Sequence, residues 1–391
     1  MIDKSYINKF GSLRYDNFSH GEKVDTTPLF KDYVDIIDMQ FLESLVKSKA
    51  FSPFLYDLCY YIEMIHRIDF NSKYYFHSLS PKARNLNTIK VILIYNNFFY
   101  AYNAIKDQVE IYKQDRFIGV DPEKTYILLL NDNRKLQEVY GQFYKMLSRL
   151  NTGHALYNLE HVLKKNKINY VEIKDKNIEI LPNTSFIDIP YVVELPQLKL
   201  DIENSMNSEE DSKKDLFLKR SSSQNIISDS IVISLLSKEK SNDLIKEIIK
   251  INNRESIEII LYLDNLEGIE SGYYKIANSC IEKVNFSEKT DYTKLLKEYQ
   301  EFTNLTGLNF WLFFYNSEEN INEKYDEWFI RLGYISQEIS ILATKYNLGS
   351  RGMKNYNDLY IKEKFELNEN SLIGYSLVLF PYSNTGHSVA L

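Results

Sequence analysis

The chain has 391 residues, of which 44% are hydrophobic, and this length fits one large domain or two ordinary domains with a sizeable core. Its formal net charge of -7 argues against a broad nucleic-acid-binding surface, which would need clustered excess Lys and Arg. No segment approaches about 18 uninterrupted apolar residues, and the amino-terminal sequence lacks the apolar core of a secretory signal. We therefore expect a globular, cytoplasmic protein without a membrane segment.

Cysteine and histidine patterns predict no metal site. Cys59 and Cys280 lie far apart and outside any CxxC pair, so neither a disulfide framework nor a zinc motif is predicted, and both are expected to be buried thiols. The six histidines show no HExxH or HxH spacing.

Strand-like stretches in the two halves of the chain resemble each other. IKVILIY, at residues 89–95, is followed by FFYAYNAIKDQVEI, and IEIILYL, at residues 257–263, is followed by SGYYKIANSCIEK. Tyr102 and Tyr274 each precede a glutamate by the same interval. These matches indicate an internal duplication.

Helical patterns strengthen the duplication. GHALYNL, at residues 153–159, matches GYISQEI, at residues 333–339, in spacing. Around the second segment, apolar residues recur every three or four positions, which is the period of one buried helix face: Phe329, Leu332, Ile335, Ile339 and Leu342. We therefore predict two degenerate α+β halves that pack as a pseudo-dimer.

One stretch is typical of a linker. DIENSMNSEEDSKKD, at residues 201–215, is polar, charged and free of aromatic residues. It would separate an amino-terminal half, residues 1–200, from a carboxyl-terminal half, residues 216–391.

The stretch LKRSSSQNIISDS, which follows the predicted linker, favours an anion site. Lys219 and Arg220 precede three serines and the apolar run IVISLL, at what looks like the start of a helix. Unpaired backbone N–H groups at a helix start attract anions, and Lys, Arg and Ser add charge-assisted hydrogen bonds, so the stretch suits a phosphate. The alternative is a serine-rich turn that caps a surface helix, with Ser228 or Asp229 as the N-cap.

Taken in order, these pieces resemble the flavin-dependent nitroreductase superfamily, and within it the SagB-like azoline dehydrogenases that act on ribosomally made peptides. KRSSS looks like the Arg-Arg-Ser-x-Arg segment of that family, SPKARNLNTIKVI like its Pro-Ser loop before a strand, and NLGSRG like its glycine loop. YAYN and GHALYN resemble its GxYxY turn and GHxxQN helix. The resemblance covers most of the chain and rests on the order of the motifs.

The resemblance implies FMN as the cofactor. Members bind each flavin at a dimer interface, so a fused pseudo-dimer that kept one combination of segments would bind one flavin per chain. The matching positions are Lys219, Arg220 and Ser221 for the phosphate, Ser80, Pro81 and Asn85 for the Pro-Ser loop, and Gly349, Ser350 and Arg351 for the glycine loop.

The chain also departs from the family pattern. Ser223 stands where the family has Arg or Lys near the flavin pyrimidine edge, and Asn347 replaces the first glycine of the glycine loop. VKSKAF, at residues 46–51, is the expected first-half counterpart of KRSSS, and only INNRES stands where the second half would need a Pro-Ser loop. The second flavin site is therefore expected to be eroded.

The similar azoline dehydrogenases use a Lys-Tyr pair for acid–base chemistry, because aromatisation removes a proton from a ring carbon while a hydride moves to the flavin. Lys324 and Tyr325 match this pair, and the first half keeps Tyr140 but has Val139 in place of the lysine. The alternative is a solvated lysine beside a packed tyrosine.

The implied function is oxidation of thiazolines or oxazolines to azoles in a ribosomally made peptide, with a peptide substrate and cyclodehydratase partner proteins. Two alternatives stay open. Reduced flavin could instead reduce a dehydroamino acid or a small electrophile, in which case NADH or NADPH would bleach the flavin. A flavin-free scaffold or peptide-binding protein is the other alternative, and Ser223 and Asn347 motivate it.

Overall fold

The computed structural model describes residues 5–6, 30–48, 52–69, 76–173, 178–181, 186–196, 213–221, 232–255, 257–284, 305–316, 325–354, 356–382 and 388–390. It divides into two compact units. We call Ser19–Lys214 with Ser388–Leu391 the N unit, and Asp215–His387 with Met1–Phe18 the C unit.

The N unit is built on a seven-stranded antiparallel sheet in the order β1-β6-β5-β4-β8-β11-β9. Its strands are β1 (Asp35–Asp38), β4 (Ile89–Tyr95), β5 (Phe98–Asn103), β6 (Gln108–Lys113), β8 (Tyr126–Asp132), β9 (Val171–Glu172) and β11 (Ile187–Glu194). Its helices are α2 (Met39–Lys47), α3 (Pro53–Ile62), α4 (Arg134–Tyr140) and α5 (Tyr144–Lys165), with short 3-10 turns η1 (Ala83–Asn85), η2 (Gln114–Arg116) and η3 (Gly141–Phe143).

Two smaller sheets complete the N unit. β7 (Phe117–Ile118) pairs with β10 (Glu179–Ile180), and β2 (Ile65–Asp69) lies between β3 (Phe76–Ser78) and β18 (Ser388–Ala390). The sequence assigned residues 388–390 to the second half of the chain. In the structure their backbone instead pairs with β2 of the N unit, because an exposed strand edge offers hydrogen-bond partners regardless of distance along the sequence.

The C unit has a six-stranded sheet in the order β14-β13-β12-β15-β17-β16. Its strands are β12 (Glu258–Leu263), β13 (Gly272–Ala277), β14 (Cys280–Lys283), β15 (Phe310–Asn316), β16 (Leu348–Met353) and β17 (Leu372–Pro381). Its helices are α6 (Lys214–Lys219), α7 (Lys238–Glu255), α9 (Tyr325–Ala343) and α10 (Asp358–Lys364), with the 3-10 turn η6 (Thr344–Tyr346). Helix α6 therefore begins inside the stretch predicted as a linker.

The two sheets repeat one strand order. β6-β5-β4-β8-β11 in the N unit corresponds to β14-β13-β12-β15-β17 in the C unit, and each sheet then adds the edge strand that follows its long helix, β9 or β16. The similar sequence stretches fall on equivalent elements: β4 matches β12, and GHALYNL in α5 matches GYISQEI in α9. The packing of the halves as a pseudo-dimer stays a prediction.

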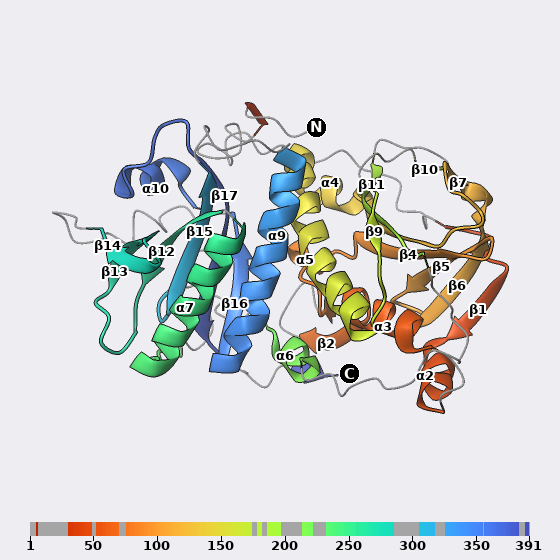
Figure 1. Ribbon diagram of the computed structural model, residues 1–391, viewed down its shortest axis with the longest axis horizontal. Helices are drawn as coiled ribbons and strands as arrows, with labels where there is room; N and C mark the ends of the chain where they lie inside the picture. The colour runs from red at the N-terminus through yellow and green to blue at the C-terminus, as the bar shows by residue number, and fades with distance from the viewer. Residues whose placement is uncertain are drawn as a thin grey trace. The chain divides into compact units, whose positions relative to one another are not determined.

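The long helices α5, α7 and α9 cover one face of their sheets. In the N unit α5 contacts β4, β8 and β11, and in the C unit α9 contacts β16 and β17 while α7 packs beside α9 (Figure 1). The predicted apolar stripe of α9 is confirmed, since Phe329, Leu332, Ile335 and Ile339 are fully buried, although Leu342 is partly exposed. The helix and strand content makes each unit α+β.

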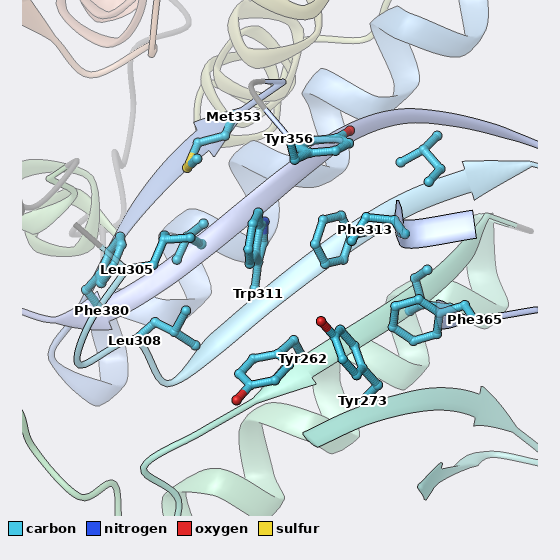
Figure 2. Close-up of a cluster of buried hydrophobic side chains, with 14 residues drawn as sticks. Tyr262, Tyr273, Leu305, Leu308, Trp311, Phe313, Met353, Tyr356, Phe365 and Phe380 are labelled. Atoms are coloured by element: carbon cyan, nitrogen blue, oxygen red, sulfur yellow. The ribbon is translucent and has the colours of Figure 1, made fainter. Parts of the chain in front are cut away.

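The opposite face of the C-unit sheet carries an aromatic core. Figure 2 shows Trp311 and Phe313 on β15 among rings from neighbouring segments, including Tyr262, Tyr273 and Tyr356. The indole N–H of Trp311 donates to the hydroxyl of Ser376 at 2.9 Å, which satisfies a polar group that burial would otherwise leave unpaired. Met353, at the end of β16, belongs to the same cluster and anchors that strand.

The cysteine prediction holds for one residue. Cys59 is buried in α3, but Cys280 is exposed on the edge strand β14, so the prediction of a buried thiol is wrong there. None of the helices in the described part of the chain is long and apolar enough to cross a membrane.

Candidate functional site

The described part of the KRSSS segment, Lys219 to Ser221, lies at the end of a helix, not at the start of one. Lys219 is the last residue of α6, and the amide of Arg220 still donates to the carbonyl of Leu216 at 3.1 Å, as in a helical turn. The apolar run that follows is not helical over residues 232–235, and α7 begins only at Lys238. The predicted helix start is therefore wrong, and the cations lie where a helix exposes carbonyl groups, which they stabilise.

The described part of this segment is hydrogen-bonded to the glycine loop. Arg220 and Ser221 are each 7% exposed, whereas Lys219 is exposed. The carbonyl of Ser221 accepts a hydrogen bond from the amide of Ser350 at 2.8 Å. Two segments that the sequence placed around one ligand, about 130 residues apart, are thus in direct contact within the C unit.

The glycine loop is the edge strand β16, which pairs with β17 so that Gly349 faces Phe380 and Arg351 faces Val378. Asn347, which replaces the first glycine of the family pattern, has φ of 59°. Asn adopts this left-handed conformation more readily than other non-glycine residues, so the replacement keeps the turn into β16.

Two arginines adjoin the contact between the segments in sequence. Arg220 precedes Ser221, and Arg351 follows Ser350. Burial lowers the pKa of Arg351 to about 10, which still leaves the side chain positively charged at neutral pH. Arginines beside backbone hydrogen-bonding groups match the chemistry of a phosphate group.

The predicted Pro-Ser loop belongs to the N unit and joins β3 to β4. The hydroxyl oxygen of Ser80 is buried and has no hydrogen-bond partner among the described residues. The loop is fastened to α5 because the amide of Ala83 donates to the side-chain oxygen of Asn151 at 3.1 Å. Asn85 follows Arg84, and both have left-handed backbones, with φ of 54° and 49°.

The loop also contacts the predicted catalytic Tyr140. This residue ends α4, and the guanidinium carbon of Arg84 lies 4.9 Å from the centre of its ring. A cation over an aromatic face is a favourable contact, so Tyr140 and the loop support each other.

Lys82, inside the loop, was not singled out by the sequence. Burial lowers its pKa to about 8, a charged Lys90 acts in the same direction, and Glu63 opposes both. Its ammonium donates to the side-chain oxygen of Asn87 at 2.9 Å.

A buried cluster beneath the loop was also missed. The Asp69 carboxylate receives two hydrogen bonds from Arg67, at 2.7 and 3.0 Å, and lies 2.8 Å from Nε2 of His77. The same His77 nitrogen lies 3.3 Å from Nδ2 of Asn85. No motif spacing announces this group, since its members come from two strands and a turn.

The other predicted residues are only partly placed. Tyr325 is the first residue of α9, whereas Lys324 and Ser223 lie outside the described residues, as do Ser228 and Asp229. The Lys-Tyr pair and the pyrimidine-edge position therefore stay predictions.

The residues present fit a phosphorylated flavin chemically. Within the C unit, buried Arg220 and cationic Arg351 offer charge for a phosphate. Within the N unit, the buried hydroxyl of Ser80 lacks a hydrogen-bond partner among the described residues, which a polar ligand group could supply.

No protein-family model matches the sequence, and no curated protein matches it. Among solved structures, the chain is similar to an assigned nitroreductase from Anabaena variabilis, with a TM-score of 0.65 and 13% identity over 93% of this chain and 96% of that one. It is also similar, with a TM-score of 0.33 and 15% identity over 54% of this chain and 80% of that one, to a chain of the E. coli microcin synthetase complex McbBCD bound to truncated pro-MccB17. Because the first similarity extends over nearly all of both chains, the protein has a nitroreductase-like fold.

Proposed function

We propose that this protein is an FMN-dependent dehydrogenase that oxidises azoline rings in a ribosomally made peptide to azoles. The observation that carries the flavin part is the hydrogen bond between Ser350 and Ser221, since it joins the two segments expected to bind one phosphorylated cofactor. The nitroreductase fold supports an oxidoreductase, and the sequence resemblance to azoline dehydrogenases supports the ring chemistry.

The proposed cofactor contacts come from the chain's own charged and polar groups. Arg220 and Ser221 would hold the FMN phosphate, with Arg351 adding positive charge and Gly349 allowing close backbone approach. The Ser80–Asn85 loop would contact the isoalloxazine ring and satisfy the Ser80 hydroxyl. When bound, FMN supplies the two-electron acceptor that ring oxidation needs. The duplication adds the proposal of a pseudo-dimer with one flavin per chain.

Proton transfer is proposed for side chains near the substrate. The pair formed by Lys324 and Tyr325, the first residue of α9, would take the ring proton. Tyr140 would orient groups beside the loop. A lysine serves as a base when its pKa lies near the working pH. A peptide substrate and a cyclodehydratase partner follow from the same sequence resemblance.

The first experiment measures flavin. The purified protein is incubated with excess FMN and desalted, and flavin released by heat is quantified per chain by absorbance. We expect one FMN per chain. A colourless protein after this treatment would exclude the proposal and favour a flavin-free binding protein, and two flavins would show that the second site is intact.

The second experiment tests the chemistry. A synthetic peptide that carries one thiazoline is incubated with the FMN-loaded protein and oxygen, and its mass is followed. Azole formation removes two hydrogens from the peptide and transfers two electrons to the flavin, which oxygen then reoxidises to give hydrogen peroxide. An unchanged peptide, together with bleaching of the flavin by NADH or NADPH, would indicate a reductase.

A further inference from the structure

The Arg67–Asp69–His77 cluster contacts the end of the Ser80–Asn85 loop, because Nε2 of His77 lies 3.3 Å from the side-chain nitrogen of Asn85. The Asp69 side chain is 7% exposed and the His77 side chain 10% exposed, so both are largely removed from water. The cluster is fully built, because Arg67 occupies both oxygens of Asp69 and His77 approaches one of them. Buried charges are retained only where partners satisfy them, and here Arg67 and His77 satisfy Asp69.

Hydrogen-bond chemistry fixes the orientation of His77. Burial raises the pKa of Asp69, but hydrogen bonds from His77 and Arg67 outweigh burial, so the pKa lies below its ordinary value and the carboxylate is ionised. An ionised carboxylate only accepts hydrogen bonds, so Nε2 of His77 must carry the proton directed at Asp69. Asp69 thereby sets both the tautomer and the ring plane of His77.

The oriented ring in turn meets Asn85. The same Nε2 lies 3.3 Å from the side-chain nitrogen of Asn85; with the amide turned so that its oxygen faces the ring, the one N–H is shared between Asp69 and Asn85. Asn85 and Arg84 are consecutive left-handed residues, a conformation that costs energy and persists only where surrounding contacts hold it. The contact with His77 is one such contact. It restrains the loop at Asn85, whereas the bond to Asn151 restrains it at Ala83.

We propose that Asp69 and His77 are positioning residues, which hold Asn85 and with it the Ser80–Asn85 loop in the conformation that contacts the flavin. The role of the loop rests on the proposed function. The restraint of the loop by His77 is a property of the protein without cofactor, and it can be measured in the cofactor-free protein.

The test compares three variants with the wild type by hydrogen exchange of the cofactor-free protein. His77→Ala removes the contact, His77→Gln keeps an amide that donates to Asp69, and His66→Gln is the matched control on β2, whose ring contacts the Tyr60 carbonyl instead of the loop. The reporting amides are those of Asn85 and Leu86, which donate to the carbonyls of Lys82 and Ala83 within the turn.

We expect His77→Ala to speed hydrogen exchange at these two amides by about tenfold, because it removes one hydrogen bond to a group paired with a charge. Exchange in His77→Gln and His66→Gln should stay near the wild-type rate. FMN affinity should fall about tenfold in His77→Ala and recover in His77→Gln. Equal loop exchange in His77→Ala and the wild type would overturn the proposal, and so would faster exchange spread evenly over the whole chain. A wild-type protein that binds no FMN would refute the proposed function, while the exchange data would still decide the role of His77.

Discussion

The amide of Ser350 donates to the carbonyl of Ser221 at 2.8 Å, and this bond joins an edge strand to the end of α6. Ser350 faces Leu379 in the β16–β17 ladder, but its N–H points away from β17. The bond therefore belongs to the candidate phosphate site and not to the sheet. Because the bond lies outside the β16–β17 ladder, a substitution can remove it without removing a hydrogen bond of the sheet.

Ser350→Pro should abolish the contact and leave the sheet intact. Proline lacks the N–H and is tolerated on an edge strand when that N–H faces away from the ladder. We expect FMN affinity to fall by about tenfold or more, the loss typical of one hydrogen bond near a charged ligand. Ser350→Ala keeps the amide and serves as the control. Wild-type FMN affinity in Ser350→Pro, measured by flavin fluorescence quenching, would contradict the assignment.

The neighbouring cations at the end of α6 should differ in importance. Arg220 is buried and Lys219 is exposed, so only Arg220 is placed to make a desolvated bond to a phosphate. Arg220→Gln should weaken FMN binding by roughly 10- to 100-fold, whereas Lys219→Gln should change it less than about threefold. Equal losses in the two variants would indicate general electrostatic attraction in place of a defined site. The flavin content after desalting, measured at two salt concentrations, distinguishes these outcomes.

Local periodicity predicted the repeated architecture because the pattern records which side chains are buried. Nearby sequence determines which face is buried in α9, β4 and β12. Whether the KRSSS segment begins or ends a helix could not be predicted from local periodicity. Cations suit a helix end and serines suit a helix start, so the composition fits either terminus.

Long-range pairing explains the other differences. β18 joins β2 across more than 300 residues, and the Asp69–His77–Asn85 contacts depend on how β2, β3 and η1 fold against one another. The apolar residues at 232–235 are not helical, and Leu236 forms a parallel bridge with Leu266 instead. None of these three relationships leaves a period or spacing in the sequence.

His66 should make the protein less stable as the solution is acidified. Burial lowers its pKa to about 4, although the Tyr60 carbonyl that its ring contacts at 2.8 Å partly opposes this shift. Between pH 6.5, the ordinary pKa, and about pH 4, His66 is protonated in the unfolded chain but not in the folded chain. The free energy of unfolding therefore falls as the pH falls through this window. The loss should reach about 3 kcal/mol below pH 4.

His66→Gln provides the comparison, because its amide can donate to Tyr60 but does not titrate. Urea unfolding at pH 7 and pH 4.5 should show a smaller pH-dependent loss in this variant than in the wild type. The same slope in both proteins would assign the acid sensitivity to other groups, and an NMR titration of the His66 ring would measure its pKa directly.

Gly374 allows α9 to lie close to β17. A β-carbon built at this position would lie 2.3 Å from a methyl carbon of Leu332 and 2.7 Å from the ring of Trp328. Gly374→Ala should therefore destabilise the protein by about 1–3 kcal/mol through overpacking. Adding Leu332→Ala should cost less in the Gly374→Ala background than in the wild type, because the two changes are complementary in volume. Strict additivity in urea unfolding would show that the strand moves away from the helix without strain.

The buried ion pair after β16 offers a final test of what holds the glycine loop. Lys354 donates to both oxygens of Asp358, at 3.0 and 2.9 Å, and their side chains are only 3% and 7% exposed. It also donates to the carbonyl of Ile373 on β17, so one ammonium links β16, β17 and α10. Lys354→Met removes the ammonium partner of a buried carboxylate and should cost about 3–5 kcal/mol.

The double variant Lys354→Met/Asp358→Leu removes both charges and should recover most of that stability, since apolar replacements of a buried pair are often near neutral. FMN affinity then separates two roles for the pair. If the pair positions β16, the double variant should be stable yet bind FMN more weakly than the wild type, because the end of the strand has lost its polar anchor. Wild-type affinity in the stable double variant would show that the apolar contacts of Met353 are enough to hold Gly349 and Ser350 in place.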